Sequence, residues 1–306
     1  MDPAPDPMFD DDAPIGYMQR TRDWYLALGY GNPYRWAHHA DVAFRPLHKP
    51  LAQCTATIVT TAAPFDPRKG PQGPGAAYNA AAKFHDVYSG DTGADHDLRI
   101  AHVAIDRRHT TMEDSGSWFP LPALRQAAAR GRIGRLAARF HGAPTNRSQR
   151  RTTEVDAPEI VARCHADGVD VALLVANCPV CHQTLSLVAR QLEAAGIATV
   201  VMGCAKDIVE HVGVPRFLFS DFPLGNAAGK PNDPASQAAT LELALRVLES
   251  APAARTTVQS PQRWSDSAAW KQDYCNAART SVEELARLRA EFDEGKTAAR
   301  QLRTAG

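Results

Sequence analysis

The sequence lacks an excess of either charge, a long hydrophobic run and a dense set of cysteines. Lysine plus arginine and aspartate plus glutamate both number 34 among 306 residues, so no surplus indicates a nucleic acid or an anionic membrane as partner. The longest apolar run, residues 169–176, is far shorter than the roughly 18 residues of a membrane-spanning helix. Hydrophobic residues nevertheless make up 44%, which predicts a globular chain that buries a large core without disulfides.

The sequence also shows no signal peptide. Residues 1–14 are acidic and rich in proline, without a basic flank or an apolar core, and we expect them to form a disordered arm. Six cysteines are too few for a disulfide scaffold in a chain of this length. We therefore expect a cytoplasmic protein with reduced thiols, in which a close cysteine pair serves redox, catalytic or metal chemistry.

Apolar runs alternate with amphipathic helical segments in the second half of the chain. We expect strands at 169–176, 197–202 and 216–220, and helices at 154–167, 180–195, 205–211 and 234–250. This order predicts an α/β fold, an open and mostly parallel sheet with helices on both faces, of the Rossmann or flavodoxin-like kind.

The first half and the C-terminal tail have weaker patterns. We expect a helix at 21–28, strands at 56–61, 99–105 and 133–140, a long loop at 64–93 and a helix at 121–130. The predicted α/β domain covers residues 15–250, as one body or as two lobes at 15–150 and 151–250. Residues 251–306 are expected to be a proline-containing linker followed by a helical extension that serves docking or oligomerisation.

The most specific feature is the Cys-Pro-Val-Cys segment that follows the strand expected at 169–176. Asn177 or Cys178 would occupy the N-cap of the next helix and Pro179 its first turn, where proline is favoured. Free amides and the helix dipole stabilise negative charge there, so Cys178 should ionise more easily than an ordinary thiol. Cys181, three residues on, could then resolve a bond that Cys178 has formed.

Two other interpretations of the pair are open. Free cysteines are commonly buried as small hydrophobic residues. A zinc site needs about four ligands, and the chain has no second Cys-x-x-Cys, although His182 and Cys204 are nearby in sequence. We therefore predict no metal.

Other polar residues are expected at the same edge of the sheet. His102, Asp106 and His109 lie in or just after the strand expected at 99–105, and they are candidates for general acid–base catalysis. Ligands of open α/β sheets bind where strands end and helices begin. The predicted substrate-binding residues near such positions are Asn177, His182, Cys204, Asp221 and Asn226.

Several segments follow one another in a fixed order: L-G-Y and P-Y-R-W within 28–36, P-L-H-K-P at 46–50, R-I-A-H-V-A-I-D at 99–106, W-F-P-L-P-A-L-R at 118–125, D-G-V-D-V-A-L-L at 167–174, A-A-G-I-A-T-V-V at 194–201 and V-P-R-F with F-P-L-G-N within 214–226. Taken together, they resemble the B component of the glycine, sarcosine and betaine reductases and the related D-proline reductase subunit.

The resemblance implies a selenoprotein B-like enzyme in which Cys178 stands at the selenocysteine position and Cys181 at that of its partner. It implies that Cys178 attacks a carbon that bears a heteroatom, and that a dithiol carrier such as thioredoxin supplies the electrons, with no other cofactor. Thr184 stands where some members carry a third cysteine, and no self-cleaving segment for a pyruvoyl group is evident. Glycine is therefore a doubtful substrate.

These observations lead to one main hypothesis and two rivals. The main one is a thiol-dependent reductase of a small molecule, with Cys178 as nucleophile, Cys181 as resolving thiol, and His102, Asp106 or His109 as proton donor. One rival is a general thiol–disulfide oxidoreductase, and the other is a non-catalytic subunit of a reductase complex. Both a thioredoxin-like donor and a partner subunit, in a homo- or hetero-oligomer, are expected partners.

Overall fold

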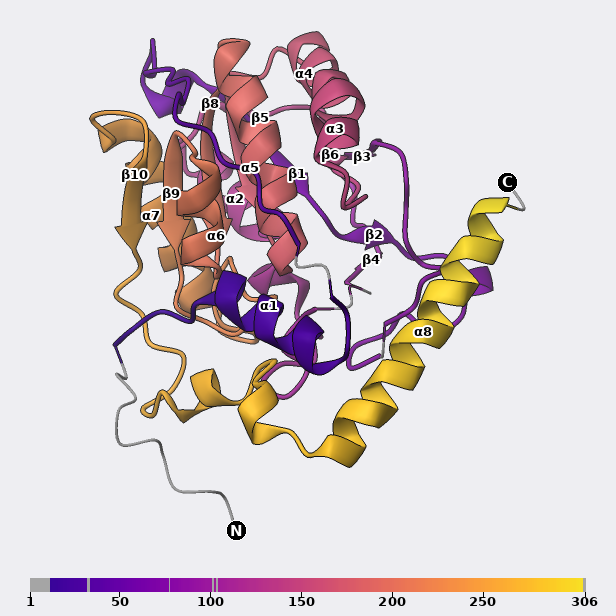
Figure 1. Ribbon diagram of the computed structural model, residues 1–306. Coiled ribbons are helices and arrows are strands. Elements are labelled where there is room, and N and C mark those ends of the chain that lie inside the picture. Colours follow the sequence, from indigo (N-terminus) through magenta and orange to yellow (C-terminus); the bar gives the residue numbers. More distant parts are fainter. Residues whose placement is uncertain (1–11, 32–33, 77, 101, 103, 305–306) are drawn as a thin grey trace.

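The computed structural model describes residues 12–31, 34–76, 78–100, 102 and 104–304. Eight strands form one mixed, mostly parallel sheet with helices around it (Figure 1), which confirms the predicted α/β class. The sheet consists of β1 (Thr55–Thr60), β3 (Tyr88–Asp91), β5 (Arg135–Leu136), β6 (Arg139–Gly142), β7 (Val171–Val175), β8 (Ala198–Gly203), β9 (Arg216–Phe219) and β10 (Thr256–Gln259).

The strand order is β10-β9-β8-β7-β1-β6-β3, with β5 also paired to β1. All pairings are parallel except that of β3 with β6. Because β1 pairs with β6 on one side and β7 on the other, residues 15–150 and 151–250 contribute to the same sheet.

Helices cover both faces of the sheet. α5 (Pro179–Ala194) packs on β7 and β8, between α4 (Ala157–Ala166) and α6 (Lys206–Val212), and α1 (Tyr17–Ala27) packs on α6. α7 (Pro234–Ser250) contacts β8 and β9, and it also contacts α2 (Leu121–Ala129). The remaining helices include α3 (Gln149–Arg151), which a π-helical segment (Thr152–Asp156) joins to α4, and the C-terminal α8 (Val282–Thr304).

The core lies along the central strands. Every residue of β1, β7 and β8 is buried, as expected for strands that helices cover on both faces. Gly168 and Gly196 follow α4 and α5 with φ of 63° and 92°, the left-handed backbone that ends a helix. No helix among the described residues is both long and apolar enough to cross a membrane.

Several sequence-based elements differ from the structure, and the loop expected at 64–93 contains β3. The strand expected at 99–105 is reduced to β4 (Leu98–Arg99), which pairs with β2 (Ala63–Pro64) in a separate small sheet, because β3 occupies the edge beside β6. Ala101 and Val103 lie outside the described residues. The strand expected at 133–140 is divided into β5 and β6, which both pair with β1.

The linker expected at 251–265 also contains a strand. Thr256, Thr257 and Val258 are β-branched, and they extend the sheet as β10 alongside β9. Most of the arm expected at 1–14 lies outside the described residues.

Candidate functional site

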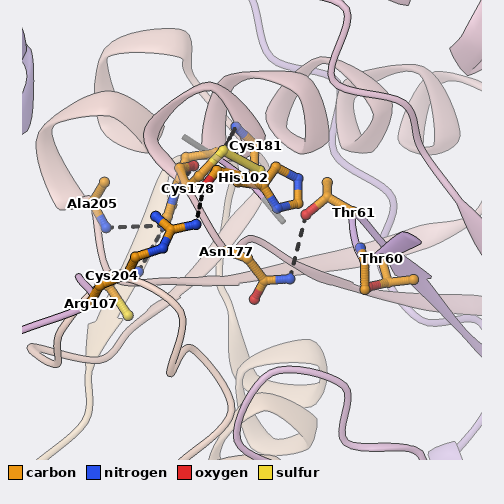
Figure 2. The surroundings of a disulfide bond; sticks show 11 residues. Thr60, Thr61, His102, Arg107, Asn177, Cys178, Cys181, Cys204 and Ala205 are labelled. Carbon is orange, nitrogen blue, oxygen red and sulfur yellow. Dashed lines mark hydrogen bonds between the residues drawn. A yellow bond between two sulfur atoms is a disulfide. The ribbon is translucent and has the colours of Figure 1, made fainter. Parts of the chain in front are cut away.

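The cysteine pair lies at the point where the strand order of the sheet reverses. The chain passes from β6 on one side of β1 to β7 on its other side, so a crevice is expected at the carboxyl ends of β1 and β7. Thr61 follows β1 and Asn177 follows β7, and the Asn177 Nδ2 donates to the Thr61 Oγ1 at 3.4 Å (Figure 2). The Asn177 Oδ1 is buried and has no hydrogen-bond partner among the described residues.

Of the two predicted N-cap candidates, Asn177 and Cys178, it is Cys178 that caps the N-terminus of α5, and Pro179 begins the helix. The backbone N–H of Cys181 donates to the Cys178 sulfur at 3.3 Å. A disulfide joins the two residues, whose Cα atoms are 4.9 Å apart. Cys178 is 5% exposed and Cys181 is fully buried. After reduction, the same N–H and the helix dipole would stabilise a Cys178 thiolate.

His102 lies beside this pair, although it is 76 positions earlier in the chain than Cys178 by their numbers. One ring nitrogen of His102 and the two sulfurs all lie within 4.8 Å of one another (Figure 2). Arg107 holds the segment in place, since its guanidinium donates to the carbonyls of His102 at 2.6 Å and Ala76 at 2.9 Å. Burial lowers the pKa of His102 to about 4, so its imidazole is neutral near pH 7.

His182 positions the cysteine pair through its two ring nitrogens. Its Nε2 accepts from the backbone N–H of Cys204 at 2.8 Å and of Ala205 at 3.1 Å, so the proton resides on Nδ1, which donates to the Cys178 carbonyl at 2.7 Å. The side chain is fully buried, and burial lowers its pKa to about 4. His182 was predicted as a substrate ligand, and here both of its nitrogens bind backbone instead.

Gly203 makes this arrangement possible, and the sequence analysis did not find it. A Cβ at Gly203 would lie 2.5 Å from the Cδ2 of His182, so only glycine leaves room for the ring. Its place at the end of a buried strand, one residue before Cys204, is the available signal in the sequence.

Asp106 and His109, the other predicted acid–base residues, form a pair of their own. The Nδ1 of His109 lies 2.9 Å from an Asp106 carboxylate oxygen, and its Nε2 lies 3.6 Å from Asp273. The Asp106 carboxylate also accepts from the backbone N–H groups of Arg108 and His109. Burial raises the pKa of Asp106, while His109 opposes that shift. No described contact joins this pair to the cysteines.

The remaining predicted residues are engaged in internal contacts. Asp221 forms an ion pair with Lys271 at 2.5 Å. Asn226 is fully buried, donates to the Pro223 carbonyl at 3.1 Å, and lies 3.4 Å from the Thr110 hydroxyl. Cys204 is buried, and burial raises its pKa to about 12.

A pocket of about 970 Å³ adjoins the cysteine turn. Pro179 and Val180, the residues between the two cysteines, line it together with Ala104 and Arg107 from the segment after His102. Figure 1 shows α1 and α8 at the end of the sheet where α5 begins, and residues of both helices line the pocket. Its aromatic residues are Trp24, Tyr25, Tyr34, Trp36, Tyr78 and Tyr274, and its cations are Lys69, Arg107 and Arg147.

Sequence reasoning did not identify this pocket. Much of its wall comes from residues 21–36, which include four aromatic side chains, from the long loop expected at 64–93 and from the C-terminal segment. The density of aromatic residues and the loop length were visible signals, but only the folded chain brings the three segments together.

The fold and the site define an α/β protein with a disulfide-forming cysteine pair at the switch point of its sheet. The chain belongs to the family of D-proline reductase gamma subunits and glycine reductase component B gamma subunits, as the resemblance predicted. It is 30% identical over 226 residues to D-proline reductase subunit gamma of Acetoanaerobium sticklandii, an alignment that covers 72% of this chain and 88% of that protein.

Two glycine reductase complex component B gamma subunits match shorter regions. The one from Carboxydothermus hydrogenoformans is 27% identical over 134 residues, which are 43% of this chain and 31% of that protein. The one from Peptoclostridium acidaminophilum is 26% identical over 155 residues, which are 49% of this chain and 35% of that protein. This chain thus aligns with about a third of each. No protein-family model and no solved structure matches the chain.

Proposed function

We propose that this chain is the thiol-bearing subunit of a reductase that cleaves a carbon–heteroatom bond of a small molecule. Cys178 is the nucleophile and Cys181 the resolving thiol. The observation that carries the proposal is the disulfide-bonded pair at the N-terminus of α5, beside a 970 Å³ pocket. The membership of the chain in a family of reductase subunits supports the same reaction class.

The chemistry balances with the two thiols as the source of electrons. The Cys178 thiolate attacks the substrate carbon, a C–S bond forms, and the leaving group departs with the C–X electron pair and takes a proton. The Cys181 thiolate then attacks the Cys178 sulfur, the S–S bond forms, and the carbon keeps the C–S electron pair and takes a second proton. The net change is R–X plus two thiols to R–H, HX and the disulfide.

His102 is the group that we assign to proton transfer. It lies within 4.8 Å of both sulfurs, and its imidazole is neutral near pH 7 because burial lowers its pKa to about 4. A neutral imidazole can accept the proton of the Cys178 thiol and deliver it to the leaving group. Asp106 and His109 would act through the loop they brace, because they contact each other and Asp273.

The substrate class follows from the pocket. Six aromatic side chains provide an apolar wall, Lys69, Arg107 and Arg147 provide positive charge, and Glu291 and Glu294 provide negative charge. A pocket with both charges suits a small zwitterion such as an amino acid. The family relatives are named for D-proline and glycine, and the pocket is larger than glycine requires.

The reaction requires a reductant. The names of the relatives also indicate that it takes place in a complex of several subunits. A dithiol carrier such as thioredoxin would attack the disulfide, return two electrons and two protons, and leave as its own disulfide. The relatives are named as subunits of reductases, so we place this chain in a hetero-oligomeric complex in the cytoplasm, with no further cofactor on this subunit. The extension around α8 offers a docking surface.

The test is to trap the covalent intermediate. The reduced Cys181→Ser variant, assembled with its partner subunits, is incubated with D-proline or glycine and digested for mass mapping. We expect a substrate-derived mass on Cys178, because the serine hydroxyl cannot resolve the thioether. Cys178→Ser should show no adduct and turn over at least about 1000-fold more slowly, as for loss of a covalent nucleophile.

Cys54→Ser is the matched control, since Cys54 is a buried thiol whose sulfur donates to the Lys49 carbonyl and serine can do the same. It should retain turnover. Turnover that survives in both Cys178→Ser and Cys181→Ser would remove the proposal. Activity of the isolated chain on generic protein disulfides would favour the rival thiol–disulfide oxidoreductase.

A further inference from the structure

The cysteine pair and His102 form a group of three metal-ligating side chains from two distant parts of the chain. One ring nitrogen of His102 and the two sulfurs lie within 4.8 Å of one another. The His102 Nδ1 is buried and makes no hydrogen bond to any described residue. The His102 ring therefore has a buried nitrogen without a partner in a group with two sulfurs, which leaves it capacity to bind a ligand.

We propose that, when the disulfide is reduced, Cys178, Cys181 and His102 bind one Zn²⁺ ion. The sequence analysis set a metal aside because Cys-x-x-Cys supplies only two ligands. The structure brings the third ligand from the segment before Ile105. Two thiolates and one imidazole form a soft donor set that Zn²⁺ prefers, and three protein ligands leave one tetrahedral position open.

The geometry is compatible with one small ion. Ligands at zinc–sulfur and zinc–nitrogen distances of about 2.3 Å and 2.0 Å lie roughly 3.5–3.8 Å apart on a tetrahedron. Three donor atoms that already lie within 4.8 Å of one another need only small side-chain movements. The open position would face water or an anion from the adjoining pocket, which Pro179 and Val180 line.

Contacts around the ligands hold them in place. Arg107 donates to the His102 carbonyl, and His182 donates to the Cys178 carbonyl at 2.7 Å. The N–H of Cys181 points at the Cys178 sulfur, and such a donor stabilises a metal-bound thiolate. The polypeptide around the site therefore constrains all three ligands before the ion arrives.

Redox state controls this site. A dithiol carrier reduces the disulfide with two electrons and two protons and is itself oxidised to a disulfide. Zinc binding then displaces one proton from each thiol, and no electron moves. The disulfide of the oxidised carrier takes two electrons back from the two thiolates and becomes a dithiol with two protons from water; this releases the ion, because the sulfurs then no longer have thiolate charge. Zinc would also shield both thiols from alkylation and would compete with the proposed reaction.

The experiment uses Co²⁺ as a spectroscopic substitute for Zn²⁺ on the full-length chain. The protein is reduced with a phosphine, freed of reductant, and titrated with Co²⁺ without oxygen. We expect one Co²⁺ per chain, with thiolate-to-cobalt charge-transfer absorption and the visible bands of tetrahedral cobalt, all displaced by Zn²⁺. The disulfide form of the same protein should show none of these bands, and this comparison requires no mutation.

The variants test the ligand set. Cys178→Ser and Cys181→Ser should lose the charge-transfer band, and His102→Gln should weaken Co²⁺ binding about tenfold or more. The matched controls are Cys54→Ser, a buried thiol whose sulfur donates to the Lys49 carbonyl, and His165→Gln, an exposed histidine on α4. Both should bind as the parent does.

Absence of thiolate-bound cobalt in the reduced protein would overturn the inference, as would unchanged affinity in His102→Gln or an equal loss in a control. The measurement contains no substrate, so it does not depend on the proposed reaction. If cobalt binds but no adduct is trapped on Cys178, the proposed reaction is wrong and the metal site remains. If an adduct is trapped but cobalt does not bind, the metal site is wrong and the proposed reaction remains.

Discussion

At the scale of single residues, the surroundings of each sulfur decide how reactive the cysteine is. Cys178 has a backbone N–H directed at its sulfur and a helix N-terminus behind it. Backbone hydrogen bonds from Asn226 and Phe222 lower the pKa of the Cys204 thiol, but burial outweighs them. Burial raises the pKa of Cys164, Cys204 and Cys275 to about 12, and it also raises the pKa of Cys54.

Alkylation of the reduced protein should therefore single out Cys178. We expect it to react with iodoacetamide at least about tenfold faster than Cys54 near pH 7, because a larger fraction is thiolate. Peptide mapping by mass over a pH series gives the rate at each cysteine. Equal rates at Cys178 and Cys54 would show that the helix terminus does not activate the thiol.

At the scale of elements, the site depends on a junction between α5, β8 and α6. His182 on α5 accepts from two N–H groups at the start of the turn after β8, and Gly203 provides the space for its ring. The N-terminus of α5 is thus held at a defined position relative to the end of β8. This contact keeps Cys178 at the mouth of the crevice.

Gly203→Ala should disturb this junction. The added Cβ would lie 2.5 Å from His182, and overpacking of this kind destabilises a core by about 1–3 kcal/mol. We expect a lower free energy of unfolding by chemical denaturation, together with slower alkylation of Cys178. Gly73→Ala is the control, since a Cβ there meets nothing within 4 Å. An unchanged alkylation rate in Gly203→Ala would show that this junction does not affect the reactivity of the Cys178 thiol.

Local sequence signals predicted most elements well. Helices α5 and α7 and strands β7 to β9 lie within about two residues of their predicted bounds, since apolar runs, proline starts and glycine stops act over a few residues. The strand predicted at 99–105 was wrong. A strand forms only where a neighbouring strand has an unpaired edge, and β3 occupies the edge of β6. The strand β10 was missed because it depends on pairing with β9, a contact between segments far apart in the chain.

At the scale of the whole molecule, three histidines couple folding to pH, of which His141 and His182 are fully buried. Burial lowers the pKa values of His102, His141 and His182 from 6.5 to about 4. The unfolded chain therefore binds more protons than the folded chain between about pH 6.5 and 4. Stability is complete above that window and is lost as the pH falls through it, by up to about 1.4 kcal/mol per pH unit for each histidine.

In His141→Gln, the free energy of unfolding should fall less steeply with decreasing pH, because one of the three histidines no longer contributes. Guanidinium unfolding of parent and variant at pH 7, 6 and 5 gives the two slopes, and their difference isolates His141 from buried carboxylates. Such carboxylates, Asp106 among them, have raised pKa values and act in the opposite direction. Identical slopes would show that His141 is protonated alike in the folded and unfolded chains.

The sequence by itself determined the α/β class, a helix N-cap at Asn177 or Cys178 and the reach of Cys181 back to Cys178, because these depend on contacts between near neighbours in the chain. Only the tertiary structure placed His102 beside the two sulfurs, separated Asp106 and His109 from them, and enclosed the pocket with α1 and α8. Those arrangements depend on contacts between segments far apart in the chain. Periodicity does not encode them, since a strand or helix pattern states which face is buried but not which distant side chain packs against it.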